Sequence, residues 1–298
     1  MKNALFEYLK NSDVEYKSNV KLSKLSSIKI GGVAETIVYP SNENELTELV
    51  LFLTDNEIQY KILGRMTNVL FSDLGFSGVI ISSARLVNTS VSGKMLFAEC
   101  GVHLSQEIKK LANLGLRLSD ELYGIPASFG GAVYNNAGAY GKDISESFVY
   151  ARLFSPEKRK VFILDRSDMA FSYRKSILQK ENLIFLGGEF LVSEAPTQEI
   201  LDRLNSIFKK RLETQPYEMP SLGSIFKRND FAPVSKLIDE LGLKGTRVGD
   251  AEISQKHAGF IVNRGCATAE DVKGLISVIK EKIYRKYGFY PEEEIEYL

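Results

Sequence analysis

The sequence is poor in the residues that build disulfides and most metal sites. Its 298 residues include two cysteines, two histidines and no tryptophan. Cys100 and Cys266 stand far apart and form no C-x-x-C pair, which excludes a disulfide framework and a cysteine-built zinc site. His103 and His257 are too few for a histidine-built metal site, and no H-E-x-x-H motif or EF-hand loop occurs. We therefore predict no metal and a reducing, cytoplasmic environment.

The sequence also lacks an excess of charge of either sign and any long apolar run. Lysine plus arginine number 38, as do aspartate plus glutamate. Because the formal net charge is zero, no overall electrostatic field would attract nucleic acid or an acidic membrane, and we predict neither as a partner. Residues 1–17 carry charges throughout, unlike a signal peptide, and no apolar run approaches the ~20 residues of a membrane span. We therefore predict a soluble cytoplasmic protein with small-molecule partners, and we expect a monomer.

The common nucleotide-binding motifs are missing as well. The sequence contains no G-x-G-x-x-G and no G-x-x-x-x-G-K-[ST], so the usual Rossmann and P-loop interpretations have no support. Three other glycine-bearing segments remain, at 26–35, 62–71 and 124–141. Each alone is typical of a turn. Because each adjoins a predicted strand, together they favour one extended ligand with a pyrophosphate, for which Thr67 and Asn68 are candidate donors.

The third segment, GIPASFGGAVYNNAGAYG at 124–141, is the most unusual. It contains five glycines, four alanines and no charged residue. A flexible linker would not keep Ile125, Phe129 and Val133. The pattern instead indicates backbone that a large, flat ligand approaches closely.

The rest of the sequence predicts a strand-rich first part and a helix-rich second part. Alternating or short apolar runs predict strands at 34–40, 60–63, 78–82, 96–101, 149–154, 160–164 and 183–192. Helical spacing predicts helices after the expected N-caps Ser41, Ser105 and Thr268, and over 197–212 and 233–241. The change from strand-like to helix-like patterns near residue 195 predicts two domains, 1–194 and 195–298.

Three further segments carry reactive side chains. They are FSYRKS at 171–176, SLGSIFKR at 221–228 and PEEEIEYL at 291–298. Alone, each is typical of ordinary surface structure: a solvated arginine, a strand entry and an acidic tail. None of them by itself supports an enzyme.

In order and spacing, these segments together resemble the UDP-N-acetylenolpyruvoylglucosamine reductase family. The similar segments are SSIKIGGVAE, ILGRMTNVL, GIPASFGGAVYNNAGAYG, FSYRKS, QPYEMPSLGSIFKR, AEISQKHAGFIVNRG and the C-terminal EEEI, which span about residues 26–295. The short separation between FSYRKS and GSIFK resembles the shorter, type II form of the family. That form lacks an extra substrate-covering loop that carries a tyrosine.

The resemblance implies an α+β fold and a redox reaction. A two-lobed FAD-binding domain of the vanillyl-alcohol-oxidase (PCMH) type would occupy 1–194, and an α+β substrate-binding domain would occupy 195–298. The implied cofactors are FAD and NADPH. The implied reaction passes hydride from NADPH through FAD to the enolpyruvyl group of UDP-N-acetylglucosamine enolpyruvate, giving UDP-N-acetylmuramate for peptidoglycan synthesis.

The resemblance also implies roles for matching residues. Arg174 would hold the developing negative charge, Ser224 would donate a proton and Glu294 would stabilise the intermediate, with Glu292 and Glu293 as neighbouring alternatives to Glu294. The residues matched to FAD binding are Gly64, Arg65, Met66, Thr67, Asn68, Gly124, Ile125, Pro126, Ser128, Gly130, Gly131, Asn136, Gly138, Ala139 and Tyr140. Those matched to substrate binding are Tyr173, Lys227, Lys256, His257 and Asn263.

The sequence departs from the family pattern at four positions. Met66 replaces a glycine of the second loop, where a positive φ would cost about 1–2 kcal/mol in a non-glycine residue. We expect this departure to affect how FAD binds. Ala127 replaces glycine, Asn135 replaces methionine and Asp250 replaces a frequent glycine.

Two other functions remain open at this point. One is a different flavin oxidoreductase of the same fold, against which Ser224 and the HAGFIVN segment argue. The other is a non-catalytic nucleotide-sugar-binding protein that lost flavin through Met66. A proton donor is not needed for binding alone, so Ser224 argues against this function too. A bound-flavin spectrum would separate the binding protein from both enzymes.

Overall fold

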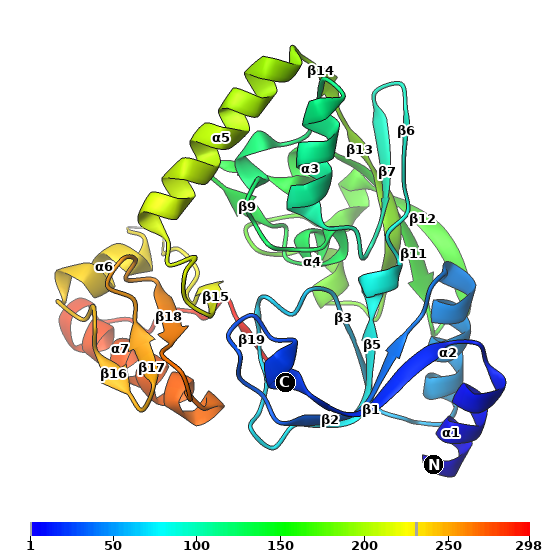
Figure 1. The fold of residues 1–298 in the computed structure, drawn as a ribbon, viewed down its shortest axis with the longest axis horizontal. Helices are drawn as coiled ribbons and strands as arrows, with labels where there is room; N and C mark the ends of the chain where they lie inside the picture. Colours follow the sequence, from blue (N-terminus) through cyan, green and yellow to red (C-terminus); the bar gives the residue numbers. More distant parts are fainter. Residues whose placement is uncertain (1, 230–231) are drawn as a thin grey trace. The chain divides into compact units, whose positions relative to one another are not determined.

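The structure is a computed structural model that describes residues 2–229 and 232–298. The chain forms two compact units (Figure 1). Unit 1 comprises Met1–Ser18, Thr36–Arg65 and Gly78–Lys209, and unit 2 comprises Asn19–Glu35, Met66–Ser77 and Lys210–Leu298. This division passes through helix α5 (Thr197–Thr214) and draws two early segments into unit 2. The functional boundary expected after residue 194 stays a prediction.

An antiparallel five-stranded sheet is the centre of unit 1. Its strand order is β12-β11-β13-β7-β6, with β6 Thr89–Ser92, β7 Met95–Glu99, β11 Phe148–Ser155, β12 Lys160–Asp165 and β13 Ile184–Leu191. Helices α3 (Leu104–Asn113) and α4 (Phe129–Tyr134) lie beside these strands in Figure 1. Leu104, Ile108 and Leu111 form the buried face of α3, as their spacing predicts.

A second sheet has the order β1-β2-β5-β3, and two helices complete the N-terminal part. The bounds are α1 Lys2–Asn11, β1 Glu15–Lys21, β2 Val33–Tyr39, α2 Glu43–Asp55, β3 Tyr60–Leu63 and β5 Phe76–Ser82. β3 and β5 are parallel, with Tyr60 opposite Val79. β3 matches its predicted range, and β5 begins two residues before its predicted start.

Two expected N-caps are wrong by one or two residues. Helix α2 is capped by Asn42, whose side chain accepts a hydrogen bond from the Glu45 N–H, while Ser41 donates to the Glu45 carboxylate from outside the helix. Helix α3 begins after His103, because the Ser105 hydroxyl instead accepts a hydrogen bond from the Gly124 N–H at 2.9 Å. The Ser105 contact ties the helix to the start of the glycine-rich stretch.

Unit 2 has its own four-stranded antiparallel sheet and two helices. The sheet order is β15-β18-β17-β16, with β15 Ser221–Ser224, β16 Arg247–Val248, β17 Ala251–Ile253 and β18 Phe260–Asn263. The helices are α6 (Val234–Glu240) and α7 (Ala269–Tyr287). The expected N-cap Thr268 is confirmed, where it forms a capping box with Asp271, and Gly288 (φ +78°) is the C-cap of α7. The apolar core of the unit includes Ile28, Leu70, Ile238, Leu275 and Ile279.

Short elements complete the described chain. The two-residue strands are β4 Val69–Leu70, β8 Leu116–Arg117, β9 Gly138–Ala139, β10 Lys142–Asp143, β14 Ser193–Glu194 and β19 Glu296–Tyr297. Single 3₁₀ turns occur at Leu22–Lys24, Ser83–Arg85, Asp120–Leu122, Ile144–Glu146, Arg166–Met169 and Ile177–Gln179. Over residues 2–229 and 232–298, the helices are too short or too polar for any of them to cross a bilayer.

Candidate functional site

In unit 1, two of the three glycine-bearing segments meet. Gly64 follows β3, and a Cβ at this position would lie only 2.3 Å from the Ser128 Oγ. Ser128 begins helix α4, and its Oγ accepts a hydrogen bond from the Gly131 N–H at 3.2 Å. The neighbouring Arg65 donates from its Nε to the Pro126 carbonyl oxygen at 3.2 Å. Glycine at 64 therefore lets the two loops pack together without displacing the Ser128 hydroxyl.

The first glycine-bearing segment meets the rest of the second loop within unit 2. The Ser27 N–H donates to the Met66 carbonyl oxygen at 3.4 Å, and the Gly32 N–H donates to the Ser72 carbonyl oxygen at 2.9 Å. A Cβ on Gly31 (φ +133°) would lie 2.7 Å from the Phe71 Cβ. These contacts explain both glycines of the IGG sequence by close packing within the protein.

The paired glycines of the third segment also have partners in the protein. The Gly130 N–H donates to the Cys100 carbonyl oxygen at 2.8 Å, and the Gly131 N–H bonds to Ser128. A Cβ on Gly130 would lie 3.0 Å from the same carbonyl oxygen. Both N–H groups are therefore already satisfied, and the lack of bulk lets α4 pack on the end of β7. A contact between this backbone and a flat ligand stays a prediction.

The end of the third segment is a tight hairpin. β9 and β10 pair around Tyr140 and Gly141, whose φ values are +51° and +84°. Positive φ at both central residues is the pattern of a type I′ turn. Tyr140 is 40% exposed at the tip, so its ring is accessible to a ligand. Gly138 and Ala139 form the strand that leads to it.

This hairpin is joined to the segment that carries Arg174. Arg174 Nη2 donates to the Gly138 carbonyl oxygen at 3.0 Å, and Asn136, only 2% exposed, donates from Nδ2 to the Ser172 carbonyl oxygen at 3.0 Å. The Ser176 hydroxyl donates to the Tyr134 carbonyl oxygen at 2.8 Å. The structure therefore brings together two segments that the sequence linked only by resemblance.

Arg174 lies in a tight turn. Ser172 and Lys175 bond to each other through both backbone groups, at 3.1 and 3.0 Å. Tyr173 and Arg174 are the central pair, and Arg174 has a φ of +55°, which a type II turn requires at its second central residue and usually gives to glycine. The guanidinium lies 5.0 Å from the centre of the Tyr173 ring. Strained backbone of this kind often occurs at functional sites.

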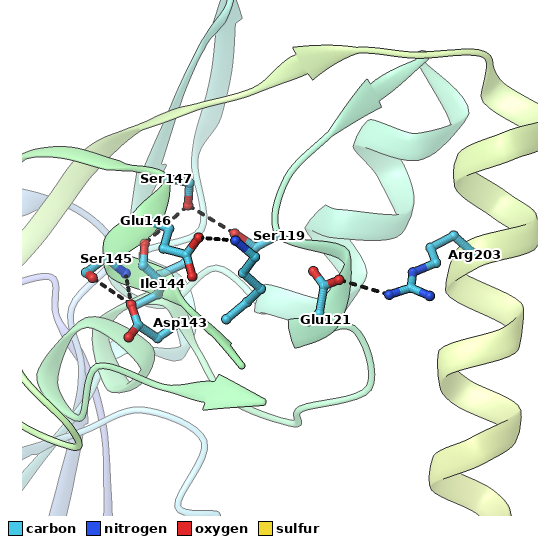
Figure 2. A network of polar contacts seen from close by, with 9 residues as sticks. Ser119, Glu121, Asp143, Ile144, Ser145, Glu146, Ser147 and Arg203 are labelled. Carbon is cyan, nitrogen blue, oxygen red and sulfur yellow. Dashed lines mark hydrogen bonds and ion pairs between the residues drawn. The ribbon is translucent and has the colours of Figure 1, made fainter. Parts of the chain in front are cut away.

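Polar contacts link the two ends of the glycine-rich stretch (Figure 2). Ser119 precedes the stretch and Ser147 follows it, and their hydroxyls lie 3.3 Å apart. Arg203 of α5 pairs with Glu121 at 3.0 Å. Next to them Asp120 is buried, and burial raises the pKa of its carboxyl. These contacts hold the residues that immediately precede the stretch against α5.

His103 is a residue of this region whose position gave no signal in the sequence. It forms an isolated β-bridge with Ser128, and among the described residues its buried Nδ1 has no hydrogen-bond partner. Burial and the positive charge of Arg65 lower the pKa of the imidazole. A buried polar atom without a partner, close to two converging glycine loops and an arginine, fits a ligand with polar and anionic groups such as FAD.

Met66, which replaces the glycine of the family, adopts a positive φ, and this conformation is unfavourable for a residue with a side chain. Its φ is +55° and its side chain is buried at 7% exposure. Thr67, half-buried, follows it and keeps a hydroxyl in the loop. Any adaptation of FAD binding to Met66 stays a prediction.

In unit 2, Ser224 ends strand β15 beside the C-terminal segment. Its hydroxyl lies 3.3 Å from the Phe226 carbonyl oxygen, and its strand partner is Phe260. The next residue, Ile225, accepts a hydrogen bond from the Glu294 N–H at 2.8 Å. The predicted proton donor and the predicted glutamate therefore lie on adjacent backbone segments.

The three C-terminal glutamates have different surroundings. Glu292 pairs with Lys227, and the carboxylate of Glu293 bonds to Lys280 and to the Tyr297 hydroxyl. The backbone of Glu294 is held at both ends of its residue, by Ile225 and by Asn68. Glu294 is thus fixed between the segment after Ser224 and the second loop, and its catalytic role stays a prediction.

The residues matched to substrate binding differ in accessibility. Tyr173 of unit 1 is 44% exposed, and in unit 2 Lys256 forms an ion pair with Glu218 at 3.4 Å. His257 accepts a hydrogen bond from the Gly259 N–H at its Nδ1, and burial and Lys244 lower its pKa. Asn263 is 3% exposed, and its side chain bonds to the backbone of Ile28, Gly265 and Ala267. Asn263 therefore has a clear structural role, while substrate binding by these residues stays a prediction.

Comparison with known proteins gives matches along the whole chain. A family model described as UDP-N-acetylenolpyruvoylglucosamine reductase, C-terminal domain, matches residues 215–298, and one described as FAD binding domain matches residues 34–157. The chain is 41% identical to the UDP-N-acetylenolpyruvoylglucosamine reductase of Caldicellulosiruptor bescii, over 98% of this chain and 93% of that protein. It is also 41% identical to that of Pseudothermotoga lettingae, over 95% of this chain and 97% of that protein.

Solved structures support the same relationship. The crystal structure of UDP-N-acetylenolpyruvylglucosamine reductase from Thermus caldophilus matches with a TM-score of 0.81 and 30% identity, covering 95% of this chain and 98% of that chain. Glucooligosaccharide oxidase from Acremonium strictum, at 14% identity and a TM-score of 0.51, shares the fold alone. The predicted α+β fold, with an FAD-binding domain first and a second α+β domain after it, is confirmed.

Proposed function

The chain belongs to the UDP-N-acetylenolpyruvoylglucosamine reductase family, and we propose that it is an FAD-dependent oxidoreductase that reduces the enolpyruvyl group of UDP-N-acetylglucosamine enolpyruvate with NADPH. The product, UDP-N-acetylmuramate, is a precursor of peptidoglycan. When bound, FAD supplies the hydride chemistry between NADPH and the enolpyruvyl double bond. The residues that would hold it are the loop 64–68, the stretch 124–141 and His103.

The protein supplies charge and a proton where the substrate changes. Hydride addition at C3 of the enolpyruvyl group leaves electron density at C2 and on the adjacent carboxylate. Arg174 stays charged at every physiological pH and stabilises this negative charge. Ser224 donates a proton to C2, and Glu294 stabilises the developing charge through a hydrogen bond from its carboxyl. A serine hydroxyl is a weak acid, but a carbanion-like centre is basic enough to take its proton.

One observation supports this assignment most directly. The Glu294 N–H donates to the carbonyl oxygen of Ile225 at 2.8 Å, and Ile225 directly follows Ser224. A hydroxyl and a carboxyl from residues 70 positions apart in sequence are thereby carried by adjacent segments. A protein that only bound a nucleotide sugar would not need this pair.

The experiment is to follow the flavin spectrum of purified protein through the two halves of the reaction. We expect a bound-flavin spectrum, bleaching with NADPH under anaerobic conditions, and recovery of colour after UDP-N-acetylglucosamine enolpyruvate is added. A colourless protein that does not take up FAD would contradict the proposal. Bleaching without recovery would indicate a flavin oxidoreductase with another substrate.

Replacing Ser224 with alanine tests the proton donor. We expect Ser224→Ala to leave bleaching by NADPH intact and to slow recovery by the sugar about 10²-fold or more. The matched control is Ser92→Ala, which changes an exposed serine of strand β6 and should slow neither half-reaction. Equal losses in both half-reactions of Ser224→Ala would argue against proton donation.

A further inference from the structure

The C-terminal segment is built against the residues that follow the second loop. Strand β19 pairs in parallel with β4, with Glu296 opposite Val69. The Leu298 N–H donates to the Leu70 carbonyl oxygen at 3.1 Å, and the Ser72 N–H donates to the Leu298 carbonyl oxygen at 2.6 Å. The end of the chain is therefore ordered by an early segment of the sequence.

Asn68 makes two contacts with this segment, one through its side chain and one through its backbone. Its Nδ2 donates to the Glu294 carbonyl oxygen at 3.0 Å, and its own carbonyl oxygen accepts from the Glu296 N–H at 2.9 Å. Ile295, between the two contacts, is buried in the core of unit 2. Asn68 thus holds the peptide groups on both sides of Ile295.

The opposite side of the same segment is held by the residues that follow Ser224, the last residue of β15. Ile225 accepts from the Glu294 N–H, and the Lys227 N–H donates to the Glu292 carbonyl oxygen at 2.9 Å. Glu294 is therefore fixed at its N–H by the Ser224 segment and at its carbonyl oxygen by Asn68. A backbone fixed at both groups determines where the carboxyl side chain begins.

We propose that Asn68 is a positioning residue for Glu294, so that it acts on the protonation half of the reaction through the C-terminal segment. The inference rests on the proposed function and gives Asn68 a role beyond the contact with FAD that the family resemblance implies. Small displacements of catalytic groups are costly, because a misplacement of about 1 Å can slow a reaction about 10²-fold. Loss of the Asn68 amide releases one of the two contacts that place Glu294.

The first test compares two asparagine variants in the full-length protein loaded with FAD. At saturating FAD, we expect Asn68→Ala to slow flavin reoxidation by the enolpyruvyl sugar about 10- to 100-fold and to slow flavin reduction by NADPH much less. The control is Asn56→Ala at the C-cap of α2, which also removes a bond from a side-chain amide to a carbonyl oxygen, and it should change neither half-reaction. Loss of FAD as the main effect of Asn68→Ala would overturn the inference.

A double-mutant cycle tests whether Asn68 acts through Glu294. If it does, Asn68→Ala slows reoxidation in the native background but adds little in a Glu294→Ala background, because the side chain being positioned is no longer there. Independent, multiplicative losses in the double variant would overturn the inference. The isosteric Asn68→Asp variant removes the donor and sets an acceptor-only carboxylate against the Glu294 carbonyl oxygen, so it should slow reoxidation at least as much as Asn68→Ala.

Hydrogen exchange gives a readout that needs no activity. A peptide covering residues 292–298 should exchange faster in Asn68→Ala than in the native protein, because losing the side-chain bond to the Glu294 carbonyl oxygen loosens the segment whose Glu294 and Glu296 N–H groups are hydrogen-bonded. Unchanged exchange would contradict the structural part of the inference. The native protein separates the two levels of failure. If it shows no substrate-dependent reoxidation, the proposed function fails. If it does and the Asn68 variants behave like Asn56→Ala, only the role of Asn68 fails.

Discussion

Met66 and Arg174 share one backbone conformation in very different surroundings. Both have a φ of +55°, in the left-handed region that costs a side chain about 1–2 kcal/mol. Met66 is buried, and its loop packs with other backbone at Ser27. Arg174 is half-buried, and its side chain contacts the Gly138 carbonyl oxygen and the Tyr173 ring. The strain is thus offset by apolar burial in the first region and by polar contacts of a charged side chain in the second.

The difference indicates what each region contributes. A buried methionine in a strained loop can stabilise the protein and shape a binding surface, but it offers no reactive group. A strained arginine in a turn presents a permanent charge from a backbone that cannot easily move. We therefore expect substitutions in the Met66 loop to change stability and FAD retention. Substitutions in the Arg174 turn should change the rate at which the enolpyruvyl sugar is reduced.

The largest effect is expected from replacing Arg174. Arg174→Ala and Arg174→Gly both remove the guanidinium, so each should slow flavin reoxidation by the enolpyruvyl sugar about 10²- to 10³-fold. Glycine tolerates the positive φ and alanine does not, so Arg174→Gly should be the more stable of the two by about 1 kcal/mol. Stopped-flow reoxidation and thermal unfolding measure the two properties separately.

The paired variants separate charge from backbone strain. If Arg174→Gly kept nearly native reoxidation, the charge would not be needed and the comparison between the two regions would lose its basis. Arg174→Lys keeps a charge without the planar fork and should fall between the native protein and alanine.

Much of the fold could be predicted from the sequence, whereas the roles of the site residues stay predictions, and the limits have physical causes. Apolar periodicity predicted α7 and most strands because burial of a regular face leaves a local pattern. The Arg174 turn was missed because nothing local marks a non-glycine residue with positive φ. The contacts of Asn68 with Glu294 join residues 226 positions apart, and a hydrogen bond between a side-chain amide and a distant carbonyl has no signature in sequence.

The glycine-rich stretch shows a second limit of the sequence. Its composition predicted that a large, flat ligand approaches the backbone closely, and that contact stays a prediction. The structure shows that other parts of the protein make several of these approaches, as at Gly130 beside Cys100 and at Gly138 beside Arg174. Composition indicates that space is scarce around a residue, but it does not tell whether a ligand or the protein fills that space.

A smaller effect is expected from Met66→Gly. The change relieves about 1–2 kcal/mol of strain but removes a buried side chain worth about 1.5–3 kcal/mol, so we expect a net loss of about 1 kcal/mol in the free energy of unfolding. FAD retention should be unchanged or tighter, because glycine is the family residue at this position. Urea unfolding and FAD titration by fluorescence measure the two quantities. A large loss of FAD would show that the Met66 side chain is an adapted contact.

The smallest effect concerns His103, whose pKa depends on how strongly the loop that carries Arg65 and Met66 is desolvated. Burial and the nearby Arg65 lower its pKa, and burial and Lys244 lower that of His257. The folded protein therefore binds protons at these rings more weakly than the unfolded chain, whose histidines titrate near about 6.5. The stability that depends on the neutral rings is present above about pH 6.5 and is lost as the pH falls, by at most about 1.4 kcal/mol per pH unit for each histidine.

NMR titration tests this directly, because the sequence has only two histidines and His257→Gln assigns the remaining signal to His103. We expect that signal to titrate below pH 6.5, and His103→Gln to lose less stability than the native protein between pH 7.5 and 5.5. A His103 ring that titrated at or above pH 6.5 would show that the region around Arg65 is well solvated. The contrast between the Met66 loop and the Arg174 turn depends on desolvation of the Met66 loop, so that result would contradict it.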